Sequence, residues 1–416
     1  MRAAGIGLRY RSMPSELAHA WTLDPAILFL NHGSFGATPR AVLDAQTRWR
    51  ARMEAEPVRF LATELEGHLD AARSELASFL GADQQDLAFM PNATAGFNTV
   101  LASLRFEPGD ELLVTDHSYN AAKNALEAAA ERWGARPVVV EVPFPGATPG
   151  DVCTRVLAAV SPRTRLALLD HVTSPTALVY PIRELIAELS ARGVETLIDG
   201  AHAPGMLELD LGALGADYYT GNCHKWLCAP KGAGFLWVRR DRQAQIRPLA
   251  ISHGANSPRT DRSRFRLEMD WTGTMDPSAY LSVPDALRFG GSLVPGGWAE
   301  LRARSHALAV AARDLMCAAL ALDPPAPDDM IGSMASVQLP FEAGPGAVQG
   351  VDLADPLHDR LLADHGIEAM ITPWPQRPAG LAWRRLVRIS AAPYNSLDDY
   401  RRLAEALPAA MASLTA

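Results

Sequence analysis

Two residues that could take part in one reaction, Asp199 and Lys225, lie 26 positions apart in this chain of 416 residues. Asp199 belongs to the stretch Leu197-Ile-Asp-Gly-Ala-His202, and Lys225 belongs to Gly221-Asn-Cys-His-Lys-Trp226. A lysine amine forms a Schiff base with an aldehyde, and a carboxylate keeps a pyridine nitrogen protonated. The pair therefore matches the needs of an aldehyde cofactor such as pyridoxal phosphate (PLP), although either residue alone is common as a surface charge or a helix cap.

Both residues are expected near the ends of strands. Asp199 follows the short apolar run 196–198, and Lys225 comes shortly after 217–220, a half-aromatic run that is typical of a strand end. Open α/β sheets bind ligands at the carboxyl ends of their strands. We therefore expect the two side chains to meet at one edge of a sheet.

The surrounding pattern alternates between strands and helices. Apolar runs predict strands at 87–90, 111–115, 137–142, 166–170, 196–198, 218–219 and 234–238. Helical patterns lie at 39–80, from 93 onward, up to 133 and at 182–191. This alternation predicts an α/β fold with a mostly parallel central sheet between helices, joined by right-handed crossovers.

The pattern changes after the polar, arginine-rich segment 252–266. A helical stretch begins near 279 and an alanine-rich helix covers 299–321, before strands at 336–339 and 385–390 and helices at 355–365 and 396–411. We place a boundary between 284 and 297. The expected organisation is an N-terminal segment (1–25), a large domain (26–290) and a smaller C-terminal α/β domain (291–416).

Several stretches together resemble one family. Asp199-Gly-Ala-His-Ala-Pro-Gly205 followed by Gly221-Asn-Cys-His-Lys-Trp-Leu227 is similar to the class V aminotransferases, which are PLP-dependent enzymes of fold type I. The other stretches that carry the resemblance are 30–36, 56–61, 116–119, 171–176, 272–274 and 387–390. Within the family, the chain most resembles the isopenicillin N epimerase branch. The resemblance implies a PLP-dependent transferase-like fold, PLP as cofactor, a homodimer, and an N-terminal segment that packs on the small domain.

The stretch Pro91-Asn-Ala-Thr-Ala-Gly96 fits the start of a helix that binds phosphate, because backbone N–H groups at a helix N-terminus attract anions. The residues alone fit an ordinary helix cap as well. The resemblance assigns contacts to the cofactor phosphate to Ala93, Thr94, Asn222, His224 and, from the second subunit, Thr274.

Three further residues are expected around the cofactor ring. His117 follows the strand at 111–115, and the resemblance implies that its flat ring stacks on the pyridine. Ser174 and His202 match positions near the phenolic oxygen. Desulfurases of this family usually carry Asn and Gln at these two positions, and the difference favours the epimerase branch.

Arg388 matches the family arginine that binds a substrate carboxylate with its planar guanidinium. Asn31 and His32 are further candidates on the carboxylate side. The substrate is therefore expected to be a small molecule of the amino-acid type.

The expected reaction begins when a substrate amine displaces Lys225 and the freed amine removes the α-proton. Return of the proton on the opposite face, for which His117 or another group would be the acid, gives an amino-acid epimerase, and this is the function that we favour. Loss of a β-substituent gives a carbon–sulfur lyase, and proton return at the cofactor gives an aminotransferase. A non-catalytic PLP-binding protein is the alternative of another class.

Residue types disfavour three other chemistries. A cysteine desulfurase needs a nucleophilic cysteine in the loop before Arg388, and the sequence has none between His365 and Arg388. Cys223, His224 and Cys228 lack a second ligand cluster at zinc-site spacing, so we expect no metal. The stretch 32–36 has histidine where the nucleophile elbow of a hydrolase requires glycine.

The charge balance and the cysteine content exclude further classes. A net charge of -8, from 39 basic and 47 acidic residues without a basic cluster, argues against nucleic acid as a partner. No apolar stretch is long enough to span a membrane, and four cysteines are too few for a disulfide framework in a chain this long. We expect a cytoplasmic protein that does not bind a membrane.

Overall fold

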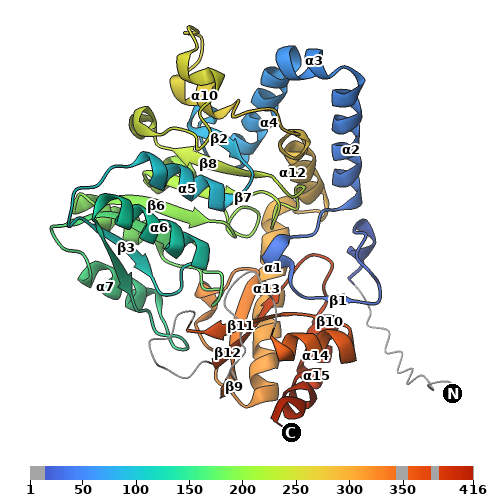
Figure 1. Cartoon of the computed structure of the whole chain (residues 1–416). Coiled ribbons are helices and arrows are strands. Elements are labelled where there is room, and N and C mark those ends of the chain that lie inside the picture. Colours follow the sequence, from blue (N-terminus) through green and yellow to red (C-terminus); the bar gives the residue numbers. More distant parts are fainter. Residues whose placement is uncertain (1–14, 343–354, 376–383, 416) are drawn as a thin grey trace.

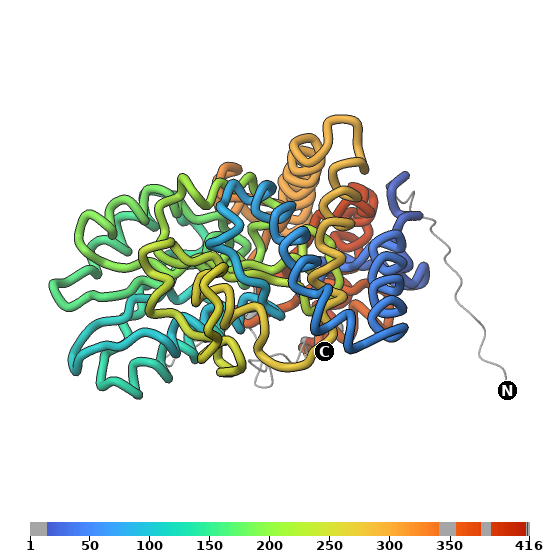
Figure 2. The backbone as a smooth tube through the Cα atoms, turned by 90° about the horizontal axis from the view of Figure 1, so that it is seen from above, coloured from blue at the N-terminus to red at the C-terminus, as the bar shows by residue number. Residues whose placement is uncertain are grey.

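The computed structural model describes residues 15–342, 355–375 and 384–415 (Figure 1). A large sheet flanked by helices occupies one part of the molecule, and a smaller sheet with its own helices lies beside it. Figure 2 shows an elongated outline in which the large sheet forms one end. None of the helices in these ranges combines the length and the apolar composition that crossing a bilayer requires.

The large sheet has seven strands in the order β2-β8-β7-β6-β5-β3-β4. The strands are β2 (Leu87–Met90), β3 (Glu111–Thr115), β4 (Arg136–Val140), β5 (Thr164–Asp170), β6 (Glu195–Gly200), β7 (Tyr218–Asn222) and β8 (Gly234–Val238). All pairs are parallel except that β8 runs antiparallel to both of its neighbours. The predicted mostly parallel sheet is confirmed.

Helices cover both faces of this sheet. They include α5 (Ala93–Ser103), α6 (Asn120–Trp133), α7 (Pro149–Ala158), α8 (Ile182–Ala191) and α9 (Leu211–Leu214). Successive strand residues alternate between two hydrophobic clusters, with Leu168 and Leu197 in one and Leu169 and Ile198 in the other. The sheet is thus buried on both faces, which leaves its strand ends as the place for polar side chains.

The predicted helix at 39–80 is not continuous. It consists of α2 (Arg40–Ala55), α3 (Pro57–Arg59), a π-helical turn (Phe60–Glu64) and α4 (Leu65–Phe79). The interruption falls at Glu56, whose φ of -154° and ψ of 82° lie outside the helical region. Because Glu56 precedes a proline, steric contact with the proline ring disfavours the helical conformation there.

The smaller part contains a three-stranded antiparallel sheet in the order β11-β12-β9. Its strands are β9 (Met334–Glu342), β11 (Met370–Trp374) and β12 (Arg384–Ser390), and its helices are α13 (Gly297–Leu320), α14 (Pro356–His365) and α15 (Leu397–Thr415). The connection from the large sheet runs through α10 (Arg264–Met269), α11 (Ser278–Leu281) and α12 (Val283–Ser292). Neither α7 nor β11 was predicted, and β4 begins one residue earlier and ends two residues earlier than its predicted range.

The N-terminal segment contacts the C-terminal part of the chain. The Ser15 hydroxyl donates to the Pro393 carbonyl at 2.8 Å, and the Trp21 ring packs edge-on against Tyr394. Farther along, β1 (Leu28–Phe29) pairs in parallel with β10 (Ile367–Glu368), so α1 (His32–Phe35) lies between the two sheets (Figure 1). Residues 1–14 of the expected N-terminal segment lie outside the described residues, and the three domain limits stay a prediction.

Candidate functional site

A cavity of about 180 Å³ lies where β5, β6 and β7 end and α5 begins. It brings together eight of the predicted site residues: Ala93, Thr94, Ser174, Asp199, His202, Asn222, His224 and Lys225. Strand ends and a helix start converge there, as expected for an α/β sheet. The cavity also has lining residues that the sequence interpretation did not assign to the site, among them Ser34 and Asp170.

Lys225 follows β7 in a buried loop, and its Nζ lies 3.2 Å from Nε2 of His202. Burial, and after it the charge of the nearby Arg388, lower the pKa of Lys225 to about 7, while the Asp199 charge acts in the opposite direction. His202 is also buried, which lowers its pKa, and its Nδ1 has no hydrogen-bond partner among the described residues. Near neutral pH, the Lys225 amine can therefore both attach to a carbonyl carbon and accept a proton.

His32 was predicted on the carboxylate side, but the structure places it behind the Lys225 loop. Its Nε2 lies 3.0 Å from the Lys225 carbonyl oxygen, and its Nδ1 lies 2.8 Å from the Tyr394 hydroxyl. Burial lowers the pKa of His32 to about 4. Since both ring nitrogens are occupied, His32 fixes the backbone that carries Lys225 and is not free to contact a substrate.

Two glycines hold the same loop by close approach. Gly36 has φ +72°, and a Cβ there would lie 2.0 Å from the His224 carbonyl oxygen. Gly205 has φ +89°, and a Cβ there would lie 2.5 Å from the Trp226 backbone. Only glycine fits these positions, because other residues would meet both backbone strain and a steric clash.

Asp199 ends β6 with its side chain turned into the cavity. The residue is 3% exposed, and its Oδ1 accepts the Ala201 N–H at 3.0 Å. Burial raises the pKa of Asp199, while the Ala201 hydrogen bond and the Lys225 charge lower it. A carboxylate in this position stabilises a cation that approaches from the cavity.

The start of α5 presents backbone donors to the cavity. Asn92 caps the helix, with its Oδ1 accepting the Ala95 N–H at 2.8 Å, and Asn222 Oδ1 accepts the Ala93 N–H at 2.8 Å. Thr94, between them, has neither its N–H nor its hydroxyl bonded to another group in the described part of the chain. The open N–H and the helix dipole fit an anion such as a phosphate, whereas Asn222 mainly fixes the helix start.

His224 also faces the cavity beside the Lys225 loop. Its Nδ1 pairs with the Ala233 carbonyl at 2.9 Å, and burial lowers its pKa to about 4. A neutral ring with Nδ1–H donated to a carbonyl leaves Nε2 as an acceptor, so His224 suits a phosphate only through a protonated oxygen or a bridging water.

Arg388 is 1% exposed and has no carboxylate partner among the described residues. Its Nη1 donates to the Ser174 carbonyl at 2.7 Å and to the Ser174 hydroxyl at 3.2 Å. Its Nη2 donates to Ser34 Oγ at 2.9 Å and to Asn31 Oδ1 at 3.4 Å, and its Nε has no partner. Burial lowers the pKa of Arg388 to about 10. A buried guanidinium held only by neutral groups is suited to pair with an anion.

His117 does not line the cavity. Its Nδ1 lies 2.7 Å from Thr176 Oγ1, its Nε2 lies 2.9 Å from the Val142 carbonyl, and its ring packs edge-on against Trp374. The predicted stacking role therefore lacks geometric support. Tyr119 lines the cavity instead, is 40% exposed, and has a hydroxyl without a hydrogen-bond partner among the described residues.

His117 and Tyr119 lie two positions apart in the sequence, but only Tyr119 lines the cavity. Both belong to the turn after β3, in which the Asp116 carboxylate accepts the Val142 N–H at 3.0 Å. The spacing of the two aromatic residues does not indicate which of them the turn directs toward the strand ends.

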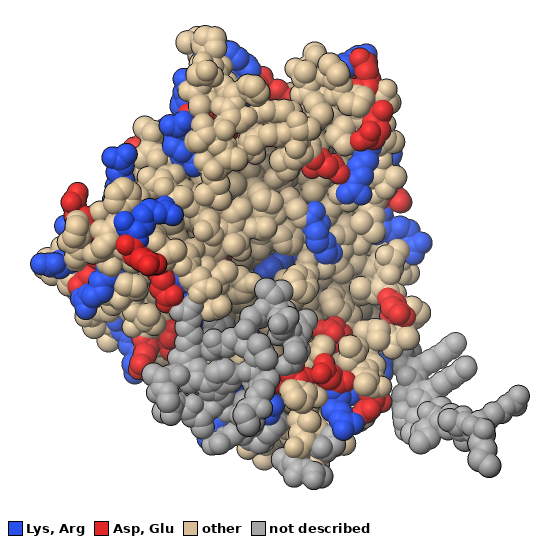
Figure 3. Space-filling model, viewed as in Figure 1, with Lys and Arg blue, Asp and Glu red and all other residues tan. Residues whose placement is uncertain are grey.

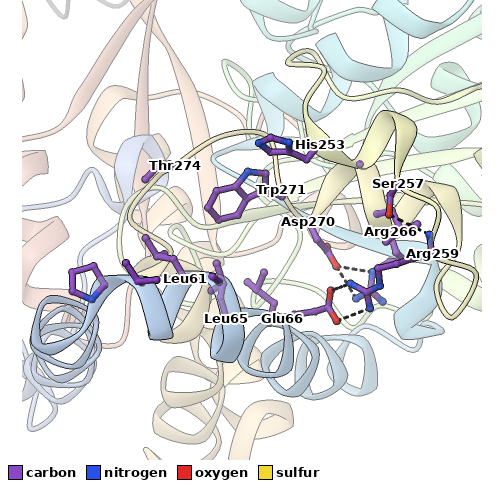
Figure 4. A pocket seen from close by; sticks show the side chains of 16 residues that line it. Leu61, Leu65, Glu66, His253, Ser257, Arg259, Arg266, Asp270, Trp271 and Thr274 are labelled. Carbon is purple, nitrogen blue, oxygen red and sulfur yellow. Dashed lines mark hydrogen bonds and ion pairs between the residues drawn. The ribbon is translucent and has the colours of Figure 1, made fainter.

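Thr274 lines a different, larger cavity of about 580 Å³ and lies apart from Lys225. In Figure 4, Trp271 and Thr274 lie on one loop and face Leu61 and Leu65 of the helical hairpin that α2, α3, the π-helical turn and α4 form. Ion pairs close the opposite end of this cavity, where Glu66 pairs with Arg259 at 2.7 Å. Within one chain, Thr274 does not reach the site of Lys225.

The chain matches the family model described as Aminotransferase class-V over residues 29–316. It is 36% identical to an isopenicillin N epimerase of Streptomyces clavuligerus, with 93% of this chain and 96% of that protein aligned. It is 32% identical to a putative L-cysteine desulfhydrase of Oryza sativa subsp. japonica, over 91% of this chain and 82% of that protein. A solved C-DES mutant structure with glycine covalently linked to its PLP cofactor has a TM-score of 0.73 at 22% identity, covering 94% of this chain and 98% of that one.

Proposed function

Because the chain belongs to the class V aminotransferase family, we propose that it is a PLP-dependent amino-acid epimerase similar to isopenicillin N epimerase. One observation carries the proposal: the half-buried Lys225 and the buried Asp199 line one cavity at the sheet edge. The buried Arg388, which has no anionic partner among the described residues, donates to Ser174 of the same cavity. PLP is the cofactor that this set of groups serves.

The cavity offers a counterpart for each polar part of PLP. The open N–H of Thr94 at the start of α5 fits the phosphate, and Asp199 fits the protonated ring nitrogen. His202 fits the phenolic oxygen, since it lies beside the Lys225 amine and has a buried Nδ1 that needs a partner. A buried polar atom without a partner costs free energy until a ligand satisfies it.

Bound PLP withdraws electrons from the substrate Cα and so makes the α-proton acidic. The Lys225 amine is the base for this proton, since burial brings its pKa to about 7 and leaves much of it neutral near pH 7. Arg388 binds the substrate carboxylate, which replaces the weak contacts to Asn31 and Ser34 with a charge-assisted pair. Together they fix Cα beside the base.

Epimerisation needs a second group that returns a proton on the other side of Cα. Tyr119 is our candidate in place of His117, because Tyr119 lines the cavity with an unpaired hydroxyl. Burial and the Asp199 charge raise the pKa of Tyr119, so the phenol keeps its proton at neutral pH and can donate it.

A carbon–sulfur lyase is the second candidate, and the similarity to the rice desulfhydrase favours it. The two reactions share the removal of the α-proton by Lys225 and differ in what happens next at Cα and Cβ. The groups of the cavity described so far serve both reactions equally.

We further propose a homodimer in which Thr274 reaches the phosphate of the partner subunit. Four large apolar side chains are exposed near the helical hairpin and the Thr274 loop: Val58, Leu249, Ile251 and Met275. The face shown in Figure 3 is mostly uncharged across its middle, with charged residues around its rim. Such a surface suits a second copy of the chain. All four cysteines are free thiols, which supports the cytoplasm as the location.

The test begins with visible absorption spectra of the purified protein and of Lys225→Ala, with Lys231→Ala as the matched control on the same loop. We expect a long-wavelength cofactor band in the wild type and in Lys231→Ala, and its loss in Lys225→Ala. Amino acids are then added in heavy water, and substrate and products are analysed by mass spectrometry and chiral chromatography.

Deuterium at Cα together with stereoinversion would establish the epimerase. Release of ammonia and pyruvate would establish the lyase, and a keto acid with the aminated cofactor would establish an aminotransferase. A cofactor band without turnover of any amino acid would indicate a non-catalytic PLP-binding protein. A wild-type protein that takes up no PLP would refute the proposal altogether.

A further inference from the structure

A second buried carboxylate lies next to Asp199. Asp170 ends β5, and the parallel pairing of β5 with β6 places Asp170 directly opposite Asp199. Paired residues of neighbouring strands project to the same face of a sheet. Both residues are 3% exposed, and both line the cavity that contains Lys225.

Asp170 also holds the turn that carries Tyr119. The Ser118 hydroxyl donates to Asp170 Oδ2, and the Tyr119 backbone N–H donates to Oδ1 at 3.4 Å. Tyr119 precedes α6 directly, so these contacts attach the start of that helix to the end of β5. Asp170 thereby connects the cavity wall that bears Tyr119 with the wall that bears Asp199.

The groups that face the two carboxylates come from several elements. Asp170 is faced by Asp199 from β6, by Lys123 from α6, by Tyr119 from the turn before α6 and by Tyr180 from the segment before α8. The charge of Lys123 lowers the pKa of Asp170, and the charge of Lys225 lowers the pKa of Asp199. Two buried carboxylates this close cannot both ionise without a cation between them.

We infer that Asp170 is a positioning residue for the cofactor ring: it fixes the Ser118–Tyr119 turn and supplies a second carboxylate, so that a ring nitrogen bound at Asp199 faces two carboxylates. The inference rests on the proposed PLP function. This role accounts for a buried acidic residue at this strand end.

The pair also provides a proton. Burial and the Asp199 charge raise the pKa of Asp170 to about 7, so below about pH 7 the cofactor-free site holds one proton shared between the two carboxyl groups. When a ring nitrogen enters at Asp199, that proton passes to the nitrogen, and the resulting cation is stabilised by two negative charges. Cofactor binding therefore needs no proton from solvent at this position.

The first test is nitrogen NMR of ring-labelled PLP bound to the wild type, to Asp170→Asn and to Asp116→Asn, across a pH series. Asparagine removes the charge and keeps one acceptor oxygen, which can serve either the Ser118 hydroxyl or the Tyr119 N–H. We expect the pKa of the bound ring nitrogen to fall by about one unit in Asp170→Asn, the size of a Coulomb term between neighbouring charges. Asp116→Asn removes a carboxylate at the same sheet edge that does not line the cavity, and should leave this pKa unchanged.

The second test uses the cofactor-free protein and thermal unfolding against pH. A carboxyl group whose pKa is raised in the folded state makes that state lose stability as pH rises from the unfolded pKa to the folded pKa. The wild type should therefore lose stability between about pH 4 and about pH 7, and Asp170→Asn should lose less. At pH 8 the cofactor-free variant should then unfold at a higher temperature than the wild type.

An unchanged ring-nitrogen pKa in Asp170→Asn, with PLP bound, would overturn the electrostatic role. Equal pH slopes for the cofactor-free wild type and Asp170→Asn would overturn the shared proton. If the wild type binds no PLP, the proposed function fails, but the unfolding experiment still decides whether the two carboxylates share a proton.

Ser118→Ala separates the positioning role from the charge. This variant keeps both carboxylates but loses the donor that ties the turn to Asp170. We expect the ring-nitrogen pKa to stay within a few tenths of a unit of the wild type and KM to rise as Tyr119 loses its fixed place. Unchanged KM in Ser118→Ala would contradict the positioning role.

Discussion

Lys225 and Arg388 are two cations of the candidate site, and the charge of the buried Arg388 makes Lys225 less ready to hold its own charge. Burial is the main cause of the low pKa of Lys225, and Arg388 is the second. A base must be neutral to accept the α-proton. Burial of a charged side chain lowers the stability of the folded protein. The same burial leaves part of the Lys225 amine neutral, and therefore able to act as a base, at neutral pH.

We predict that kcat rises with pH as Lys225 loses its proton. The midpoint of this rise should lie near pH 7, because the pKa of Lys225 is lowered to about 7. The sign follows from the role of the amine: the protonated form, which dominates below that pKa, cannot act as a base. Initial rates over a pH series, measured at saturating substrate, give this midpoint. A flat profile between pH 6 and 8 would mean that another step limits turnover.

Arg388→Gln should raise KM by about tenfold to a hundredfold, because a charge-assisted hydrogen bond to the substrate carboxylate contributes roughly 1.5–3 kcal/mol. Arg388→Lys keeps the charge but loses the two-pronged geometry, so it should recover only part of the loss. Steady-state kinetics of both variants check this. Equal KM values in the wild type and Arg388→Gln would remove Arg388 from the substrate site.

At this scale the sequence indicates residue types better than orientations. Lys225, Asp199 and Arg388 could be proposed because each of them follows or lies in a predicted strand. His117 and His32 were also proposed, but the structure gives their rings other contacts, because the direction of a side chain within a turn depends on contacts distant in the sequence. Those contacts are Thr176 and Val142 for His117, and Tyr394 for His32.

Among the elements, the segment from α10 to the Thr274 loop is held on α4 by buried charges. Arg73 and Arg266 are each 1% exposed, and both donate to Asp270, with Arg266 Nη2 3.0 Å from Asp270 Oδ2. Asp70 pairs with both arginines as well, at 2.7 Å and 2.6 Å. Asp270 directly precedes the loop with Trp271 and Thr274, so the network sets where that loop begins.

Asp270→Ala should destabilise the protein by about 3 kcal/mol, since it leaves two buried arginines short of a partner. Chemical denaturation with a fluorescence readout measures the loss. Glu188→Ala, which breaks the exposed pair of Glu188 with Arg192, is the control and should cost less than about 1 kcal/mol. Similar losses of unfolding free energy in both variants would show that the buried Asp270 network stabilises the protein no more than an exposed ion pair does.

Most strands of the large sheet were predictable because parallel strands that are buried on both faces consist of consecutive apolar residues. The short α7 was missed, although Thr148 and Asp151 form a capping box at its start. β11 was missed because Met370 to Trp374 includes a proline, which is unusual inside a strand. Its pairing with β12, which puts Met370 opposite Arg388, joins segments that no local pattern connects.

For the whole molecule, the distance between Thr274 and the Lys225 cavity leads to a prediction about subunits. If each site takes Lys225 from one chain and Thr274 from the other, Lys225→Ala and Thr274→Ala dimers should each have low activity. Mixing them under conditions that exchange subunits should restore activity, because one site of each mixed dimer then has both residues. Sedimentation measurements should show a dimer throughout.

Mixed samples that stay as inactive as their components, despite proven subunit exchange, would contradict shared sites. A Thr274→Ala variant with full activity would place the phosphate contact elsewhere. Both results leave the assignment of Lys225 intact, since its contacts lie within one chain.

The glycine contacts and the His32 hydrogen bond around the Lys225 loop limit how the amine can travel. With Gly36 on one side, Gly205 on the other and the Lys225 carbonyl held by His32, the backbone has no room to shift. The amine must move between cofactor and substrate by rotation about its own side-chain bonds, a process of roughly picoseconds to nanoseconds. This rotation is too fast to limit turnover, so the loop stays in place while the Lys225 side chain moves.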